Sequence, residues 1–249
     1  MTAINASRPG PAVPLYEQEE LYQITGGTLR PGGIALTSEI LAWCNLKAGS
    51  TMLDVGCGPG HTAALMASTF GLRPTGLDPS VAMLKKAARH APAALFVQGT
   101  ATAIPCGNSS FDGLISECVL SLTGDIEASL SEMYRVLRPG GLLLLTDIYR
   151  KQSQPKVDLP GLKSCITHAL PLEDIEEGLL HAGFTLLSFR DRSDLLKQLA
   201  GQIIFTCGSL EKFWQLFMGA EAARQTSCVL FAAPIGYYAL IAQKGERHG

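Results

Sequence analysis

Three glycines follow an aspartate in one short segment, Asp54-Val55-Gly56-Cys57-Gly58-Pro59-Gly60. The apolar run before this segment predicts a buried strand, and the residues after it predict a helix. Glycines at such a strand-to-helix turn let the chain turn tightly and let a ligand approach the backbone. N–H groups at the helix start would then be free to face polar ligand atoms. The segment is therefore a candidate cofactor-binding loop.

The aspartate distinguishes between two kinds of cofactor. Dinucleotide enzymes present Gly-x-Gly-x-x-Gly to a pyrophosphate, whereas this chain has Gly-x-Gly-x-Gly with Asp54 two positions earlier. A carboxylate there would repel a pyrophosphate but would attract a cationic sulfonium and an α-amino group. We therefore favour a sulfonium cofactor, and an NAD-dependent oxidoreductase is the weaker alternative.

A second carboxylate, Asp78, ends the next predicted strand, in Gly76-Leu77-Asp78-Pro79-Ser80. At this position a carboxylate can accept hydrogen bonds from both ribose hydroxyls. Asp78 could instead cap the helix that begins near Val81, but Ser80 fits that role better. We expect Asp78 to hold a ribose.

The elements around these residues alternate between strand and helix, which is typical of parallel βαβ units. Strands are expected at 52–55, 74–77, 94–97, 111–116, 142–146, 184–189 and 236–243. Helices are expected at 15–22, 34–46, 62–70, 81–90, 126–137, 172–181, 194–205 and 210–223. The predicted fold is α/β, with a Rossmann-like, mostly parallel sheet of seven strands, helices on both faces and an antiparallel last strand. N-terminal helices and a C-terminal helical insert complete it.

The pattern also predicts how the chain is organised. Residues 1–33 are expected to form an N-terminal arm and a segment that covers the cofactor. Residues 34–249 would form the main domain, with lid elements at 151–170 and 192–225.

Several motifs together resemble the class I S-adenosylmethionine-dependent methyltransferases. These motifs are DVGCGPG, GLDPS with Met83, the strand FDGLIS and the turn RVLRPGG. The resemblance covers residues 40–150 and extends more weakly to Gly183-Phe184 and the last strand. It is closest to the type 11 group that holds quinone-biosynthesis C-methyltransferases and arsenite methyltransferases. It implies methyl transfer from S-adenosylmethionine to a small-molecule acceptor, without identifying that acceptor.

The resemblance implies cofactor contacts at individual positions. Those at the methionine end would be Asp54, Gly56, Gly58, Gly60, Glu117 and Cys118. Asp78 would hold the ribose, with Pro79 and Met83 beside the adenine. Thr100-Ala101 stands where the family often has aspartate and alanine, which puts one adenine contact in doubt. Cys57, inside the loop, would pack as a small residue, and Arg30 would either meet the cofactor carboxylate or lie exposed in its loop.

No catalytic residue follows from these motifs, because a base is needed only if the acceptor must lose a proton. The acceptor would lie above the carboxyl ends of the strands. Residues expected there are Glu117, Cys118, Asp147 and Tyr149. Cys165 and His168 could form a thiol–imidazole pair, although such spacing is more often incidental. Phe213, Trp214 and Phe217 could line an apolar pocket, although packing of their helix on the sheet is the more common reason for such a cluster.

Composition limits the remaining classes of function. The chain has 249 residues and a formal net charge of −2, and it shows no basic stripe of the kind that binds nucleic acid. We expect no membrane span, since the apolar stretch 228–242 is short and is interrupted by Pro234 and Gly236. Seven cysteines without a CxxC pair predict packing rather than disulfides or a metal site. The expected protein is a cytoplasmic monomer or homodimer, and a non-catalytic S-adenosylmethionine-binding accessory protein is the alternative function.

Overall fold

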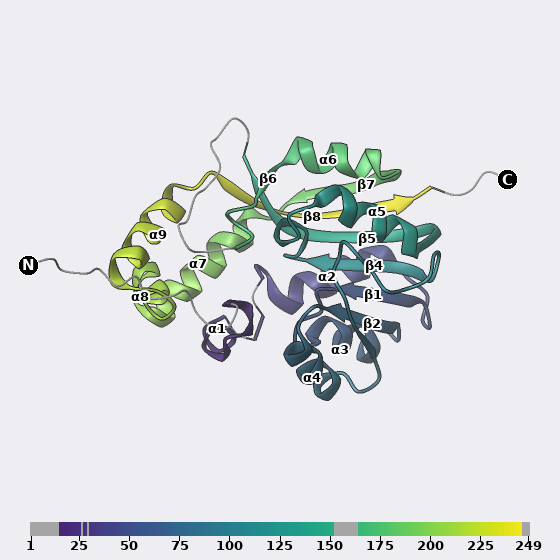
Figure 1. Ribbon diagram of the computed structural model, residues 1–249, viewed down its shortest axis with the longest axis horizontal. Helices are drawn as coiled ribbons and strands as arrows, with labels where there is room; N and C mark the ends of the chain where they lie inside the picture. Colours follow the sequence, from purple (N-terminus) through teal and green to yellow (C-terminus); the bar gives the residue numbers. More distant parts are fainter. Residues whose placement is uncertain (1–14, 26, 29, 152–163, 246–249) are drawn as a thin grey trace, which may run out of the picture.

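Apolar side chains alternate between the two faces of the central strands, which is why helices cover the sheet on both sides. On β4 (Phe111–Glu117), Leu114 packs into one core and the next residue, Ile115, packs into the other. The computed structural model describes residues 15–25, 27, 28, 30–151 and 164–245, and these form a helix–sheet–helix sandwich (Figure 1). Period-two burial on a strand thus produces the three layers.

Among the described residues the sheet has eight strands, seven of them in the order β3-β2-β1-β4-β5-β8-β7. The other strands are β1 (Thr51–Val55), β2 (Arg73–Asp78), β3 (Leu95–Gln98), β5 (Leu137–Arg150), β6 (Leu170–Pro171), β7 (Phe184–Asp191) and β8 (Ile235–Lys244). β1 to β5 pair in parallel, and β8 runs antiparallel to both of its neighbours. The predicted Rossmann-like sheet with an antiparallel last strand is confirmed, and the short β6 beside β5 is an addition to it.

The helices divide between the two faces of the sheet. One core contains residues of α5 (Ile126–Val136) and α6 (Leu172–His181). The other contains residues of α2 (Gly33–Cys44), α3 (His61–Ser68) and the start of α7 (Ser193–Cys207). The remaining helices are η1 (Leu15–Glu17), α1 (Glu19–Ile24), α4 (Val81–His90), η2 (Leu120–Leu122), α8 (Leu210–Gln215) and α9 (Ala220–Ala232). Within the part of the chain that the structure describes, no helix is long and apolar enough to cross a membrane.

Element boundaries were predicted wrongly at two segments that contain glycine. The single helix expected at 210–223 is two helices, because Gly219 is extended (φ −66°, ψ 157°) and begins α9. The turn expected at Arg138-Pro139-Gly140-Gly141 lies within β5, where a β-bulge shifts the register against β4 between Phe111 and Gly113. The first error came from treating Gly219 as a residue within a helix, and the second from expecting proline and glycine to end a strand.

A cluster apart from the sheet joins the N-terminal helix to the C-terminal insert. Leu21 of α1 packs with Ile203 of α7 and with Phe213 and Trp214 of α8. Figure 1 shows α1, α8 and α9 gathered at one end of the molecule. The aromatic cluster expected to pack on the sheet therefore packs on α1 and α7 instead.

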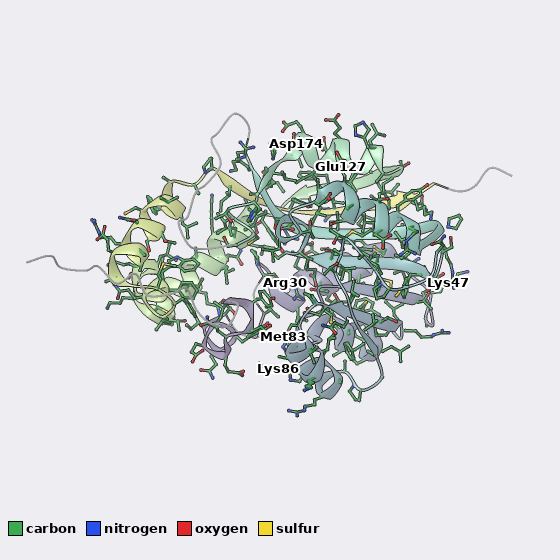
Figure 2. The ribbon with its side chains drawn as sticks, in the orientation of Figure 1. Arg30, Lys47, Met83, Lys86, Glu127 and Asp174 are labelled. Atoms are coloured by element: carbon green, nitrogen blue, oxygen red, sulfur yellow. The ribbon has the colours of Figure 1, made fainter. Side chains whose placement is uncertain are left out.

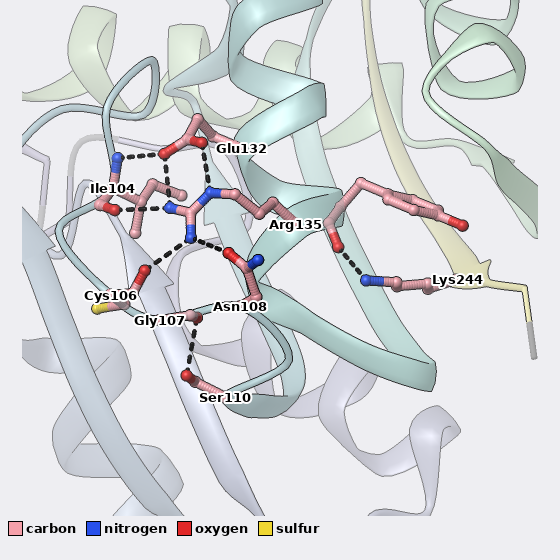
Figure 3. A network of polar contacts seen from close by, with 9 residues as sticks. Ile104, Cys106, Gly107, Asn108, Ser110, Glu132, Arg135 and Lys244 are labelled. Carbon is pink, nitrogen blue, oxygen red and sulfur yellow. Dashed lines mark hydrogen bonds and ion pairs between the residues drawn. The ribbon is translucent and has the colours of Figure 1, made fainter. Parts of the chain in front are cut away.

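The connection after β3 is held by one arginine of α5. Arg135 donates hydrogen bonds to the carbonyls of Ile104 and Cys106 and pairs with Glu132 at 2.6 Å. Figure 3 shows this network closing over the loop. Charge-assisted bonds of this kind are stronger than neutral ones, so the network fixes the loop that follows Thr100 and Ala101.

Candidate active site

The glycine loop adopts backbone angles that other residues rarely take. Gly56, Gly58 and Gly60 have φ values of +73°, +50° and +86°. A Cβ on Gly56 would collide with the side chain of Val119, and one on Gly60 would lie 2.9 Å from Cα of Ala87. Glycine is needed at these two positions for both conformation and space.

The N–H groups of this loop point into the protein. Gly56 and Cys57 both donate to the carbonyl of Leu77, at 2.7 and 3.0 Å, and Gly58 donates to Asp78 Oδ2 at 2.9 Å. The N–H groups of these three loop residues are therefore not available to a ligand. The groups left are those at the start of α3, which have no acceptor within the helix.

Asp54 is a buried carboxylate at the end of β1. It is 3% exposed, and its Oδ2 has no hydrogen-bond partner among the described residues. Burial first, and then the nearby charge of Glu117, raises its pKa to about 8, although Arg30 opposes this. An unpaired buried carboxylate is costly unless a cation approaches it, so the site is suited to a positively charged ligand.

Asp78 organises the next turn. Besides holding Gly58, it accepts a hydrogen bond from the N–H of Ser80 at 2.8 Å. Ser80 Oγ in turn accepts from the N–H of Met83, so Ser80 caps α4 as expected. Burial raises the pKa of the Asp78 carboxyl.

Arg30 lies inside the molecule and is not an exposed loop residue. Its Nε contacts Glu117 Oε1 at 2.9 Å as an ion pair, and its side chain is 14% exposed. Its Nη2 donates to the hydroxyls of Thr37 and Thr62, and each hydroxyl also donates to one oxygen of Glu117. Figure 2 places Arg30 near the middle of the molecule. The network ties the N-terminal segment to α2, α3 and the end of β4.

A cavity of about 580 Å³ brings these segments together. The sequence-predicted residues on its wall are Arg30, Gly56, Cys57, Gly58, Asp78, Pro79, Thr100, Ala101, Glu117 and Cys118. Asp54, Gly60 and Met83 lie behind this wall rather than on it. Met83 is buried and accepts a weak hydrogen bond from Tyr22 at 3.8 Å.

Only some of the residues expected around an acceptor line the cavity. Cys165 lines the cavity, whereas His168 does not; His168 is exposed, and its Nδ1 lies near the Ser164 carbonyl. Asp147 is off the wall, because its carboxylate accepts hydrogen bonds from the N–H and hydroxyl of Ser121. Tyr149 is also off the wall and donates to Asp191 at 2.6 Å.

Sequence reasoning missed several residues of the wall. Tyr16, Tyr22 and His61 line the cavity, and the Tyr22 hydroxyl donates to the Tyr16 carbonyl. Burial, with Asp78 nearby, raises the pKa of Tyr22 to about 12. No spacing signalled Tyr16 and Tyr22, because only the fold brings these residues to the cavity wall. Phe213 and Trp214, which the sequence left open as pocket residues, do line the cavity.

The cysteines are mostly placed as expected. Cys57 is buried against Gly76, whose Cβ would lie 2.8 Å from the sulfur. Among the described residues, all the cysteines are free thiols. Cys228, expected in a core, is instead exposed on α9.

Residues 53–145 match the family described as "Methyltransferase domain". Trans-aconitate 2-methyltransferase of Paracidovorax citrulli (strain AAC00-1) is 39% identical over 109 residues, which are 43% of this chain and 42% of the relative. The O-methyltransferase resE of Aspergillus sclerotiorum is 29% identical over 71% of this chain and 68% of its own length. Phosphoethanolamine N-methyltransferase 2 of Haemonchus contortus, solved with S-adenosyl-L-methionine, shares the fold with a TM-score of 0.74 and 22% identity, covering 90% of this chain and 56% of that one.

Proposed function

We propose that this chain, which carries a class I S-adenosylmethionine-dependent methyltransferase domain, transfers a methyl group from that cofactor to a small molecule. The observation that carries the proposal is the buried carboxylate of Asp54, with one unpaired oxygen, directly before the glycine loop. Such a group is suited to a sulfonium and an α-ammonium rather than to an anion.

The loop itself argues against a dinucleotide. A pyrophosphate would need N–H groups directed at it, but those of Gly56, Cys57 and Gly58 are already bonded inside the protein. Asp54, Asp78 and Glu117 would also place three carboxylates around it. The three carboxylates therefore favour a cationic nucleoside over NAD.

Each end of such a cofactor has residues suited to hold it. Asp54, from behind the wall, would attract its cationic end, and Arg30 would meet its carboxylate. Asp78 would take the ribose, with Pro79, Thr100 and Ala101 beside the adenine. When bound, S-adenosylmethionine supplies an electrophilic methyl group for in-line displacement by a nucleophile.

The rest of the cavity would position the acceptor and exclude water, which is the main contribution a protein makes to such a displacement. Glu117 is a poor candidate base, because Arg30, Thr37 and Thr62 already contact its oxygens. We propose that residues 15–33 act as the cover over the cofactor, as Tyr16, Tyr22 and Arg30 on the wall support. The lid expected at 151–170 falls partly outside the described residues. The second expected lid, 192–225, ends within α9, which extends to Ala232.

Calorimetric titration with S-adenosylhomocysteine tests the proposal. We expect micromolar binding by the native protein and no binding of NAD. Asp78→Ala should weaken binding at least tenfold, since a hydrogen bond to a charged group contributes about 1.5–3 kcal/mol. Asp125→Asn is the matched control, because Asp125 caps α5 at the surface and asparagine caps equally well. If the folded protein does not bind S-adenosylhomocysteine, or binds NAD instead, the proposal is refuted. Turnover of cofactor with any acceptor would exclude the non-catalytic alternative.

A further inference from the structure

The charged residues of the cavity all lie on its cofactor side. Among the described residues on the wall they are Arg30, Asp78 and Glu117, with His61 at the start of α3. Each of them belongs to the N-terminal segment, to the start of α3 or to the end of a strand that borders the glycine loop.

The opposite side of the cavity is apolar. It is built by η2, the end of β5, residues 164–166, α7 and α8. Its apolar members include Leu122, Ile148, Ile166, Leu196, Leu199 and Trp214. Within the described ranges, the polar groups on this side are uncharged: the Thr123 and Ser164 hydroxyls, the Cys165 thiol and the buried Trp214 indole N–H.

Arg30 does not supply a spare charge to this side. It is paired with Glu117 at 2.9 Å, and two threonine hydroxyls hold both groups in place. A charged acceptor entering the apolar side would lose its hydration without meeting a counter-charge among the described residues, which is unfavourable. An uncharged apolar acceptor would instead gain from burial against the same side chains.

We propose, building on the methyltransferase function above, that the acceptor is an uncharged, largely apolar small molecule held between α7, α8, η2 and the end of β5. This class differs from the charged acceptors named for two similar proteins, trans-aconitate and phosphoethanolamine. The fold and the cofactor half are shared with those proteins, while the acceptor wall would set this chain's specificity.

Three probes with one ring system test the charge preference: 2-acetonaphthone, which is neutral, 2-naphthoate, an anion, and 2-(aminomethyl)naphthalene, a cation. Each is titrated into the native protein, with and without S-adenosylhomocysteine, while the indole N–H resonances of Trp43 and Trp214 are followed by NMR. Trp43→Phe identifies the Trp214 signal. We expect 2-acetonaphthone to shift the Trp214 signal saturably and to bind roughly tenfold or more tightly than either charged probe.

A charge placed in the wall should reverse this preference. Leu199→Lys should weaken 2-acetonaphthone and admit 2-naphthoate, while Leu187→Lys, on exposed β7 surface, should change neither. Equal or tighter binding of a charged probe by the native protein would overturn the proposal, as would the absence of any saturable shift of Trp214. The comparison among probes is made on the native protein, and Trp43→Phe, which leaves the cavity wall unchanged, is needed only to assign the Trp214 signal. Loss of S-adenosylhomocysteine binding, by contrast, would count against the proposed function and not against the preference among probes.

Discussion

Asp54 lies where a negative charge is unfavourable until a cation arrives. Burial raises its pKa to about 8, so at pH 7 the side chain of the unliganded protein is mostly protonated. A bound sulfonium or ammonium group favours the carboxylate and lowers this pKa. Cofactor binding should therefore release a proton near neutral pH, and affinity should increase from pH 6 to pH 8 and then level off.

Calorimetry in buffers of different ionisation enthalpy measures this proton. We expect release of about half a proton or more per S-adenosylmethionine bound at pH 7. Asp54→Asn should bind more weakly, at least tenfold, and should lose the proton release between pH 6 and 8. Proton release that persists in Asp54→Asn would show that another group titrates.

Two of the thiols that line the cavity, Cys118 and Cys165, should be unreactive. Burial, with Asp147 nearby, raises the pKa of Cys165 to about 12 and that of Cys118 well above its usual range. Since the thiolate is the nucleophile, neither sulfur would compete with an acceptor for the methyl group. Iodoacetamide at pH 7.5 should alkylate exposed Cys228 roughly a hundredfold faster than either cavity thiol, as read by mass spectrometry. Rapid labelling of Cys118 or Cys165 in the folded protein would contradict this.

At the scale of single residues, the sequence indicated those whose role depends on neighbours in the chain. The glycine loop, Asp78 and the Ser80 cap are read from neighbours within a few positions. It could not place Arg30 against Glu117 or Tyr22 over Met83, because these pairs are far apart in the chain and depend on tertiary packing. Asp147 shows the reverse error, since its strand-end position suggested the site while its carboxylate is bonded to Ser121.

At the scale of elements, the start of α3 and the body of α4 are packed as one unit through Gly60. Gly49 gives a matched comparison: both have φ near +85°, but a Cβ on Gly49 would have nothing within 4 Å. Gly49→Ala should cost about 1 kcal/mol in unfolding free energy, from backbone strain alone. Gly60→Ala should cost clearly more, because Ala87 must move, and it should also weaken S-adenosylhomocysteine binding. Urea unfolding measures both, and equal losses would show that this contact is unimportant.

Most elements could be predicted because their burial follows a short period. Strands covered on both faces give continuous apolar runs, and α4 and α6 begin and end at the predicted residues. The division between α8 and α9 was missed, since a lone glycine in an apolar pattern is tolerated within helices as well as between them. The extent of β5 was missed because its first residues pair only through a bulge.

At the scale of the whole molecule, the N-terminal helix and the C-terminal insert pack together, and we propose that they form one cover over the cavity. They are far apart in the chain, yet Leu21 of α1 packs with Ile203 and Phe213 in a cluster separate from both sheet cores. Because the same segments line the cavity, the stability of this cover should control access to the site. Separate cores in one molecule can open with different free energies.

Removing the Leu21 side chain tests that coupling. Leu21 is 8% exposed, and Leu21→Ala should cost about 2 kcal/mol or more locally. Hydrogen exchange should then speed up together in α1, α7 and α8, while β1, β4 and β5 keep their protection. Leu187→Ala, at a 52% exposed position on β7, should leave all of these rates unchanged. If α1 alone loses protection from exchange, α1 and the C-terminal insert open independently. If the sheet also loses protection, the cover is part of the global fold rather than a unit that opens over the cavity.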